Sequence, residues 1–192
     1  MWFLFYPFAV QASKVVFVTT VLVNIFLIYL TVVHTKRISR AYRSMIVIFA
    51  AVGIFFTFMK ASLHPYLHSH DAGFMLFSLE KSWNNARLIE IALMVYVGVY
   101  SAMISLVAIQ FVYRYWSLFC EEKLKYFNTW RCIIWIGYVL SIGMGWSSLV
   151  YFCARSDEYS RDYMREELLS VYQMDVDRTV GFFVVVYVSV LV

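Results

Sequence analysis

Four long and almost uncharged stretches constrain the fold of this chain more than any other feature. They cover residues 15–33, 44–63, 91–113 and 132–154, and a shorter apolar run follows at 180–192. A helix needs about 20 apolar residues to cross about 30 Å of hydrocarbon. Irregular backbone cannot face lipid, and the runs lack the alternation of a membrane β-barrel. We therefore expect an all-α, polytopic membrane helix bundle in a single transmembrane domain, 1–192, with a partial fifth helix at 180–192.

The composition supports a bilayer as the solvent of these stretches. Hydrophobic residues make up 62% of the chain and charged residues 15%, whereas a soluble domain carries about 45–50% and about 25%. This apolar surface exceeds what one small core can bury. The net charge of +4 is spread over the gaps between the runs and forms no basic stripe. We therefore expect membrane lipid, and no nucleic acid, as a partner.

The loop charges predict the orientation. The first loop, 34–43, contains basic residues and no acidic residue. Cytoplasmic loops are enriched in Lys and Arg, so this loop and the third, 114–131, are predicted to be cytosolic. The second and fourth loops and the N-terminus are then outside, and we expect a multi-pass protein of the plasma membrane. The basic residues that predict a cytosolic first loop are Lys36, Arg37, Arg40 and Arg43.

The sequence contains no constellation typical of catalysis or proton transport. The spans hold almost no ionisable side chains, which argues against a proton-coupled transporter. No nucleophile–base pair, HExxH or phosphate-binding glycine loop occurs, so we expect no enzyme and no cofactor. His64, His68, His70 and Asp71 are the candidate metal cluster. Their spacing fits no standard zinc signature, so we interpret them as a polar turn and predict no metal site.

Small and polar residues within the spans predict helix packing. Asn24 lies in the middle of the first span, where a buried amide needs a partner on a neighbouring helix. Small residues at three- and four-residue spacing let two membrane helices approach closely. Such residues mark one face of the third span and one of the fourth: Gly98, Ser101, Ser105 and Ala108, and Gly137, Ser141 and Gly145.

Tyr113, Arg114 and Tyr115 close the third span on its predicted cytosolic side. The simplest interpretation is that Arg114 extends its charge to the lipid headgroups. The surrounding sequence suggests another, because QFVYRYW at 110–116 resembles the end of the third helix in nematode Str-type seven-transmembrane chemoreceptors. LKYF at 124–127 is similar to that family's second cytoplasmic loop, and DEYSRDYMREE at 157–167 to its acidic outer-loop motif.

The resemblance implies a G-protein-coupled receptor for chemical cues in sensory neurons, with sensory cilia as its location. Its implied partners are a heterotrimeric G protein and a small-molecule odorant or other chemical ligand, whose binding residues are unknown. Tyr113, Arg114 and Tyr115 would form the G-protein coupling switch. Many other receptors carry an acidic residue at the position of Tyr113, so an acid–arginine lock is not expected here.

The number of spans differs from the family pattern. The family has seven helices, whereas four and part of a fifth are counted here. We therefore expect a chemosensory receptor or a truncated form of one. Two alternatives remain: a non-signalling membrane partner of full-length receptors, and a small transporter or channel subunit.

Overall fold

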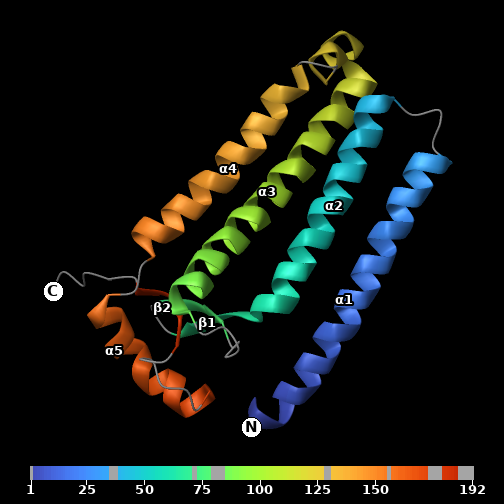
Figure 1. The fold of residues 1–192 in the computed structure, drawn as a ribbon. Helices are drawn as coiled ribbons and strands as arrows, with labels where there is room; N and C mark the ends of the chain where they lie inside the picture. Colours follow the sequence, from blue (N-terminus) through green and yellow to red (C-terminus); the bar gives the residue numbers. More distant parts are fainter. Residues whose placement is uncertain are drawn as a thin grey trace. The chain divides into compact units, whose positions relative to one another are not determined.

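The computed structural model describes residues 2–34, 39–70, 73–78, 85–127, 131–154, 157–172 and 179–185. Helices dominate, and three short strands form one sheet (Figure 1). In chain order the elements are α1 (Trp2–Val33), α2 (Arg40–Leu63), β1 (Pro65–His70), β2 (Gly73–Ser78), α3 (Ala86–Phe119), the 3-10 helix η1 (Glu121–Phe127), α4 (Cys132–Cys153), α5 (Glu158–Glu167), the π-helical turn η3 (Leu168–Tyr172) and β3 (Gly181–Val185).

Four of the helices are long and apolar enough to cross a bilayer, which confirms the predicted membrane helix bundle. The candidate spans are Gln11–Val33, Arg40–Leu63, Ala86–Phe119 and Ile133–Cys153. Three helices extend beyond the uncharged runs that predicted them, and α2 starts at Arg40 instead of residue 44. α1 starts at Trp2 instead of residue 15, and α3 covers Ala86–Phe119 instead of 91–113. Charged and aromatic side chains at a helix end reach the headgroup region, so a helix does not have to stop where the apolar run stops.

Contacts divide the chain into two compact units. The first contains residues 1–14, 60–96 and 147–192, and the second contains 15–59 and 97–146. The second unit holds the greater part of the four long helices. Within it, consecutive helices contact one another through Asn24 and Gly53, through Tyr42 and Tyr113, and through Gly98 and Gly143.

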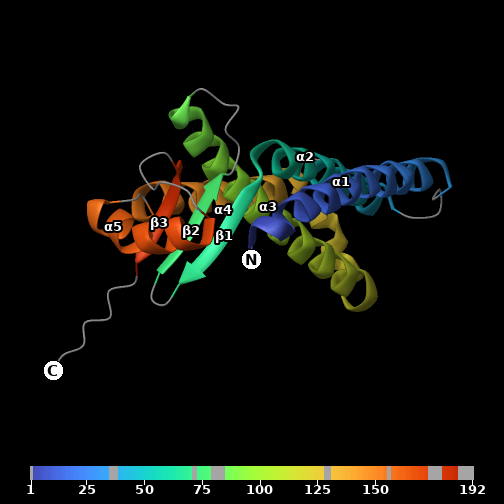
Figure 2. The same ribbon diagram turned by 90° about the horizontal axis from the view of Figure 1, so that it is seen from below.

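The first unit holds a three-stranded antiparallel sheet in the order β1-β2-β3. Figure 2 shows α5 lying over the strands, and its apolar side chains account for this. Met164 and Leu168, one helical turn apart, pack on Met75 and Phe77, and all four side chains are completely buried. Alternate residues of a strand point to opposite faces, so Met75 and Phe77 of β2 form the face that α5 covers.

The opposite face of the sheet packs on the ends of two long helices. Leu76 of β2 is paired with Phe182 of β3, and both contact a cluster that contains Leu93 of α3 and Ala154 after α4. β2 is therefore covered on both faces at Met75, Leu76 and Phe77, whereas Phe74 remains exposed. A sheet buried on both faces gives apolar strands without alternation, which explains why the sequence of β2 resembles any other apolar run.

The expected partial helix at 180–192 is wrong where the structure describes it. Gly181–Val185 form a strand that pairs with Gly73–Phe77, and the remainder of the run lies outside the described residues. The edge of β2 offers backbone hydrogen bonds to this segment, and paired strands satisfy the backbone polar groups that a helix would satisfy internally. The three strands are also an addition to the predicted all-α fold.

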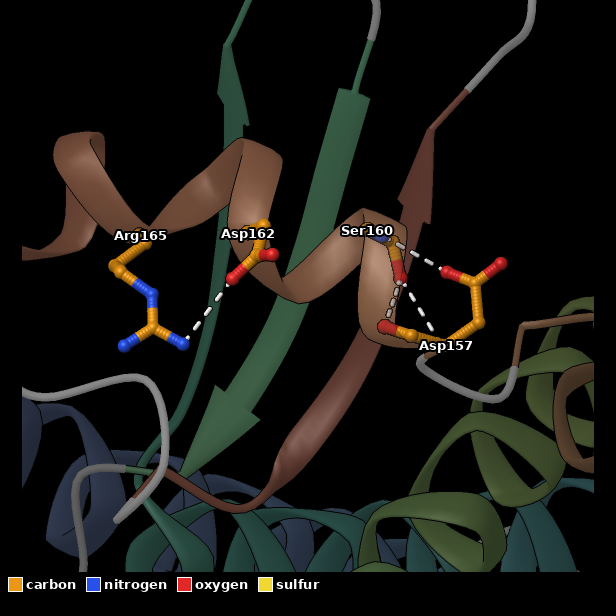
Figure 3. A network of polar contacts seen from close by, with 4 residues as sticks. All are labelled: Asp157, Ser160, Asp162 and Arg165. Carbon is orange, nitrogen blue, oxygen red and sulfur yellow. Dashed lines mark hydrogen bonds and ion pairs between the residues drawn. The ribbon is translucent and has the colours of Figure 1, made fainter.

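The acidic segment of the predicted fourth loop forms helix α5. Asp157 caps its N-terminus: the Ser160 backbone N–H donates to the Asp157 carboxylate at 2.8 Å, and the Asp157 N–H donates to the Ser160 hydroxyl at 3.1 Å (Figure 3). This reciprocal pair is a capping box. Hydrogen bonding by Ser160, first through its side chain and then through its backbone, holds the pKa of the Asp157 carboxyl below its ordinary value of 3.8.

Candidate functional site

Tyr113, near the end of α3, joins two other segments of the second unit. Its ring is buried and stacks on Tyr42 of α2, with centroids 5.2 Å apart and planes at 19°. The edge-on ring of Phe127 from η1 lies 5.0 Å away. The Tyr113 hydroxyl also shares a hydrogen bond of 2.5 Å with Ser39, the residue before α2. One tyrosine therefore holds the start of α2 and the segment after α3 against the same helix end.

Phe127 anchors η1 to α4. A 3-10 helix places residues i and i+3 on one side, so Leu124 and Phe127 both point toward the helices, and Phe127 is buried. The Phe127 ring stacks on Trp135 at 4.8 Å with planes 6° apart. The Trp135 indole N–H donates to the backbone carbonyl of Tyr126 at 3.2 Å. These contacts fix η1 against the bundle although it is only two turns long.

Arg114 is exposed, but its guanidinium is held by Tyr42. Its Nε and Nη2 groups both donate to the Tyr42 hydroxyl oxygen, at 2.9 and 2.7 Å. Its Cζ lies 5.7 Å from the centre of the Tyr42 ring, within range of a cation–π interaction. A phenol is neutral, and hydrogen bonds with one charged partner are weaker than those with two. Arg114 is thus attached to α2 by an acceptor that can release it more easily than a carboxylate could.

The three predicted switch residues have different surroundings. Tyr113 and Arg114 belong to the aromatic cluster described above, which we call the Tyr113 cluster: Ser39, Tyr42, Tyr113, Arg114, Trp116, Phe127 and Trp135. Tyr115 is exposed, and the ring it contacts is that of Phe119 on the same helix, at 5.2 Å. Sequence reasoning missed Ser39, Tyr42 and Trp135, although aromatic residues at the predicted span ends were an available signal.

The small residues of α3 are buried, whereas the predicted contact residues of α4 are not. Gly98, Ser101 and Ser105 lie inside the second unit, while Ala108 is exposed. The hydroxyls of Ser101 and Ser105 donate to the carbonyls of Val97 and Ala102 in their own helix, each at 2.8 Å. These bonds satisfy polar groups that lipid could not satisfy.

The α4 residue that meets this face is Gly143, which the sequence analysis did not select. A Cβ atom at Gly143 would lie 3.1 Å from the Gly98 carbonyl oxygen. The predicted residues Gly137, Ser141 and Gly145 are exposed, and among the described residues no atom outside the neighbouring backbone of α4 lies within 4 Å of a Cβ built on either of these glycines. Gly143 therefore makes the described close contact of α4 with α3, and the packing role of Gly137, Ser141 and Gly145 stays a prediction.

Asn24 contacts the neighbouring helix without the expected hydrogen bond to it. Its amide donates to the Thr20 carbonyl, one turn earlier in α1, at 2.9 Å. Its side chain lies against Gly53 of α2, where an added Cβ would be 3.6 Å from Oδ1.

The histidines of the expected polar turn lie at the start of the sheet: His64 precedes β1, and His68 and His70 lie in it. Asp71 falls outside the described residues, among which no group of three His, Cys, Asp or Glu could hold a metal ion.

Four apolar helices long enough to span a bilayer, found in the described part of the chain, define a polytopic helical membrane protein. The chain belongs to the family of serpentine type 7TM GPCR chemoreceptors Str, which it matches over residues 9–190. It is therefore a member of a chemoreceptor family of G-protein-coupled receptors, as the motifs around Arg114 and in α5 predicted.

Curated relatives agree with this assignment. The chain is 39% identical to G-protein coupled receptor str-33 of Caenorhabditis elegans over 177 residues, which are 91% of this chain and 51% of the relative. It is 26% identical to serpentine receptor class r-10 of the same species over 180 residues, 93% of this chain and 52% of the relative. The chain thus spans about half the length of these relatives. No solved structure gives a significant match.

Proposed function

We propose that this chain is a chemosensory receptor, or a truncated form of one, in which Arg114 is the contact that a G protein captures. The observation that carries the proposal is the pair of hydrogen bonds from the Arg114 guanidinium to Tyr42. They hold an exposed arginine at the end of a spanning helix in a defined position, with a neutral acceptor. A receptor alternates between inactive and coupling-competent states whose populations a ligand shifts. Release of Arg114 from Tyr42 is our candidate for the local step between them.

The geometry of arginine distinguishes this role from simple charge placement. A guanidinium presents five N–H donors in a rigid planar fork, whereas a lysine keeps the charge and loses the fork. Carbonyl groups at a helix end of a partner protein can use the fork. A lipid headgroup requires the charge alone, so the two roles respond differently to Arg114→Lys.

The test uses a receptor that carries these residues within a chain of the relatives' full length. Surface expression and ligand-evoked nucleotide exchange are measured for Arg114→Lys and Arg114→Ala. We expect near-normal expression with strongly reduced exchange, more so for alanine. Arg131→Lys is the matched control, because Arg131 is an exposed arginine whose guanidinium lies over the Tyr126 ring, outside the Tyr113 cluster. Normal nucleotide exchange by both Arg114 variants would contradict the coupling role and support the interpretation that Arg114 contacts lipid headgroups.

We also propose that the Tyr113 cluster faces the cytosol at the plasma membrane, with the N-terminus outside. The basic loops before α2 and after α3 support this orientation. Single cysteines at the exposed Lys123 of η1 and the exposed Ser69 of β1 test it, in a chain without the native cysteines. An impermeant thiol reagent on intact cells should label the Ser69 site alone. Labelling of the Lys123 site alone would reverse the topology.

A further inference from the structure

A cavity of about 480 Å³ lies beside the Tyr113 cluster, between the start of α2, α3 and η1. Residues from all three segments line it, and all belong to the second unit. Small-molecule sites commonly measure about 300–1,000 Å³, so this cavity can accept a group much larger than one phosphate ion. The lining residues are Ser39, Arg40, Ala41, Tyr113, Leu124, Lys125 and Phe127.

Both charged residues among the described lining residues are basic. Arg40 lies in the first turn of α2, and Lys125 lies in η1. Lys125 also lies 5.8 Å from the centre of the Tyr126 ring. Glu121 and Glu122 begin η1 but are exposed and do not line the cavity. Two cations on different segments match a ligand with two separated anionic groups.

The uncharged part of the lining also suits an anion. Ser39 and Tyr113 bring hydroxyl groups that bond to each other at 2.5 Å, and each hydroxyl has further hydrogen-bonding capacity. The first N–H groups of a helix have no partner within it, and in α2 these belong to Arg40 and Ala41, which line the cavity. Leu124 and Phe127 form an apolar wall against which a sugar ring can rest.

We propose that this cavity binds the headgroup of a phosphorylated inositol lipid. Such a headgroup carries two phosphates on a ring, and the cavity offers two cations, hydroxyls and an apolar wall. We assign a lipid as the source because Tyr113 ends the uncharged run 91–113, which places the cavity at headgroup depth. Anionic lipids of the cytoplasmic leaflet attract basic residues near the ends of spans. The choice of leaflet rests on the cytosolic orientation proposed above.

Binding is measured for the chain in phosphatidylcholine nanodiscs, which expose both faces of the bilayer. The result is therefore independent of the orientation and of G-protein coupling. The two probes are short-chain phosphatidylinositol bisphosphate and soluble inositol trisphosphate. We expect saturable binding of the lipid, and weaker binding of the soluble headgroup. Equal binding of both probes would overturn the lipid assignment, and no saturable binding of either would overturn the site.

Matched variants separate the cavity from the general positive charge of this end of the bundle. Arg40→Gln with Lys125→Gln removes the two lining cations. Lys123→Gln with Arg131→Gln removes the same charge from exposed residues that do not line the cavity. Both cations are available to bond to the phosphates, so we expect the first pair to weaken lipid binding at least about tenfold. An equal loss with the second pair would show diffuse attraction and overturn the proposal.

A third variant tests the cavity volume without changing the charge. Ala41→Leu adds a larger side chain to the lining, and it should reduce lipid affinity while both cations remain. Its melting temperature in the same nanodiscs, without the probe, is compared with that of the parent chain to show that the fold is kept. Unchanged affinity in a folded Ala41→Leu chain would place the lipid outside the cavity and overturn the assignment.

Discussion

Tyr42→Phe removes the oxygen that holds Arg114 and changes little else. The phenylalanine ring can keep the stacking on Tyr113 at 5.2 Å and the contact with the guanidinium at 5.7 Å. The two hydrogen bonds to the Tyr42 oxygen, at 2.9 and 2.7 Å, are lost. This substitution therefore isolates the attachment of Arg114 to α2 from the packing of the Tyr113 cluster.

The size of the effect follows from the exposure of Arg114. A net hydrogen bond to a charged group is worth about 1.5–3 kcal/mol in mutational series. Arg114 is exposed, so water replaces much of what is lost, and both donors share one oxygen. We therefore expect the attachment to be worth about 1 kcal/mol, near the upper end for exposed polar pairs. This corresponds to about fivefold in the population of the released state.

The assay is ligand-free nucleotide exchange by a receptor of the relatives' full length that carries these residues. If release of Arg114 precedes coupling, Tyr42→Phe should raise the basal rate by up to about fivefold. Tyr138→Phe is the matched control, because Tyr138 loses the same oxygen from an exposed site on α4 outside the Tyr113 cluster and the predicted switch. A basal rate that falls, or that changes equally in both variants, would refute the role of the Tyr42–Arg114 attachment.

Three further substitutions test the packing. Gly143→Leu should lower the melting temperature of the chain in detergent, because even a Cβ at this position would lie 3.1 Å from the Gly98 carbonyl oxygen. Gly137→Leu is the control and should leave the melting temperature unchanged, because the space around Gly137 is open. Equal melting temperatures for the two variants would contradict this packing. Gly181→Ala should speed hydrogen exchange in β2, because its Cβ would lie 2.8 Å from Phe77 Cα; unchanged exchange would contradict the strand pairing. The lowered pKa of Asp157 means that its carboxylate stabilises α5 above pH 3.8 and loses this effect as the pH falls through the folded-state pKa. The protection of α5 amides, relative to their intrinsic exchange rate at each pH, should therefore fall below about pH 4. Asp157→Asn, which cannot titrate, should remove this pH-dependent fall, and its persistence would exclude Asp157 as the cause.

The spanning helices could be predicted from the sequence because a long apolar segment surrounded by lipid is stable only as a helix. Every backbone polar group must be satisfied within the segment itself, which leaves the helix. The runs 15–33, 44–63, 91–113 and 132–154 therefore lie within α1 to α4, apart from Ala154, which follows α4. The receptor family was also accessible from sequence, since the motifs at 110–116 and 157–167 are short, contiguous and rich in aromatic and charged residues.

The tertiary structure decided the segments whose hydrogen bonds depend on partners. A strand is satisfied by its neighbours, so β3 at Gly181–Val185 exists because β2 offers an edge. The 13 apolar residues of the run containing it, 180–192, give no local sign of that edge. The face of α4 that meets α3 likewise depends on helix rotation, and Gly143 makes the described close contact.

The residues of the candidate site also fall into those that the sequence indicated and those that only the structure revealed. Tyr113 and Arg114 could be selected from the sequence, because a charge at the end of an uncharged run is visible locally. Their partners Ser39 and Tyr42 lie 74 and 72 residues away in the chain. Whether an exposed arginine contacts lipid or is held by a phenol depends on which side chains the packing brings within 3 Å of it, and only the folded chain fixes that distance.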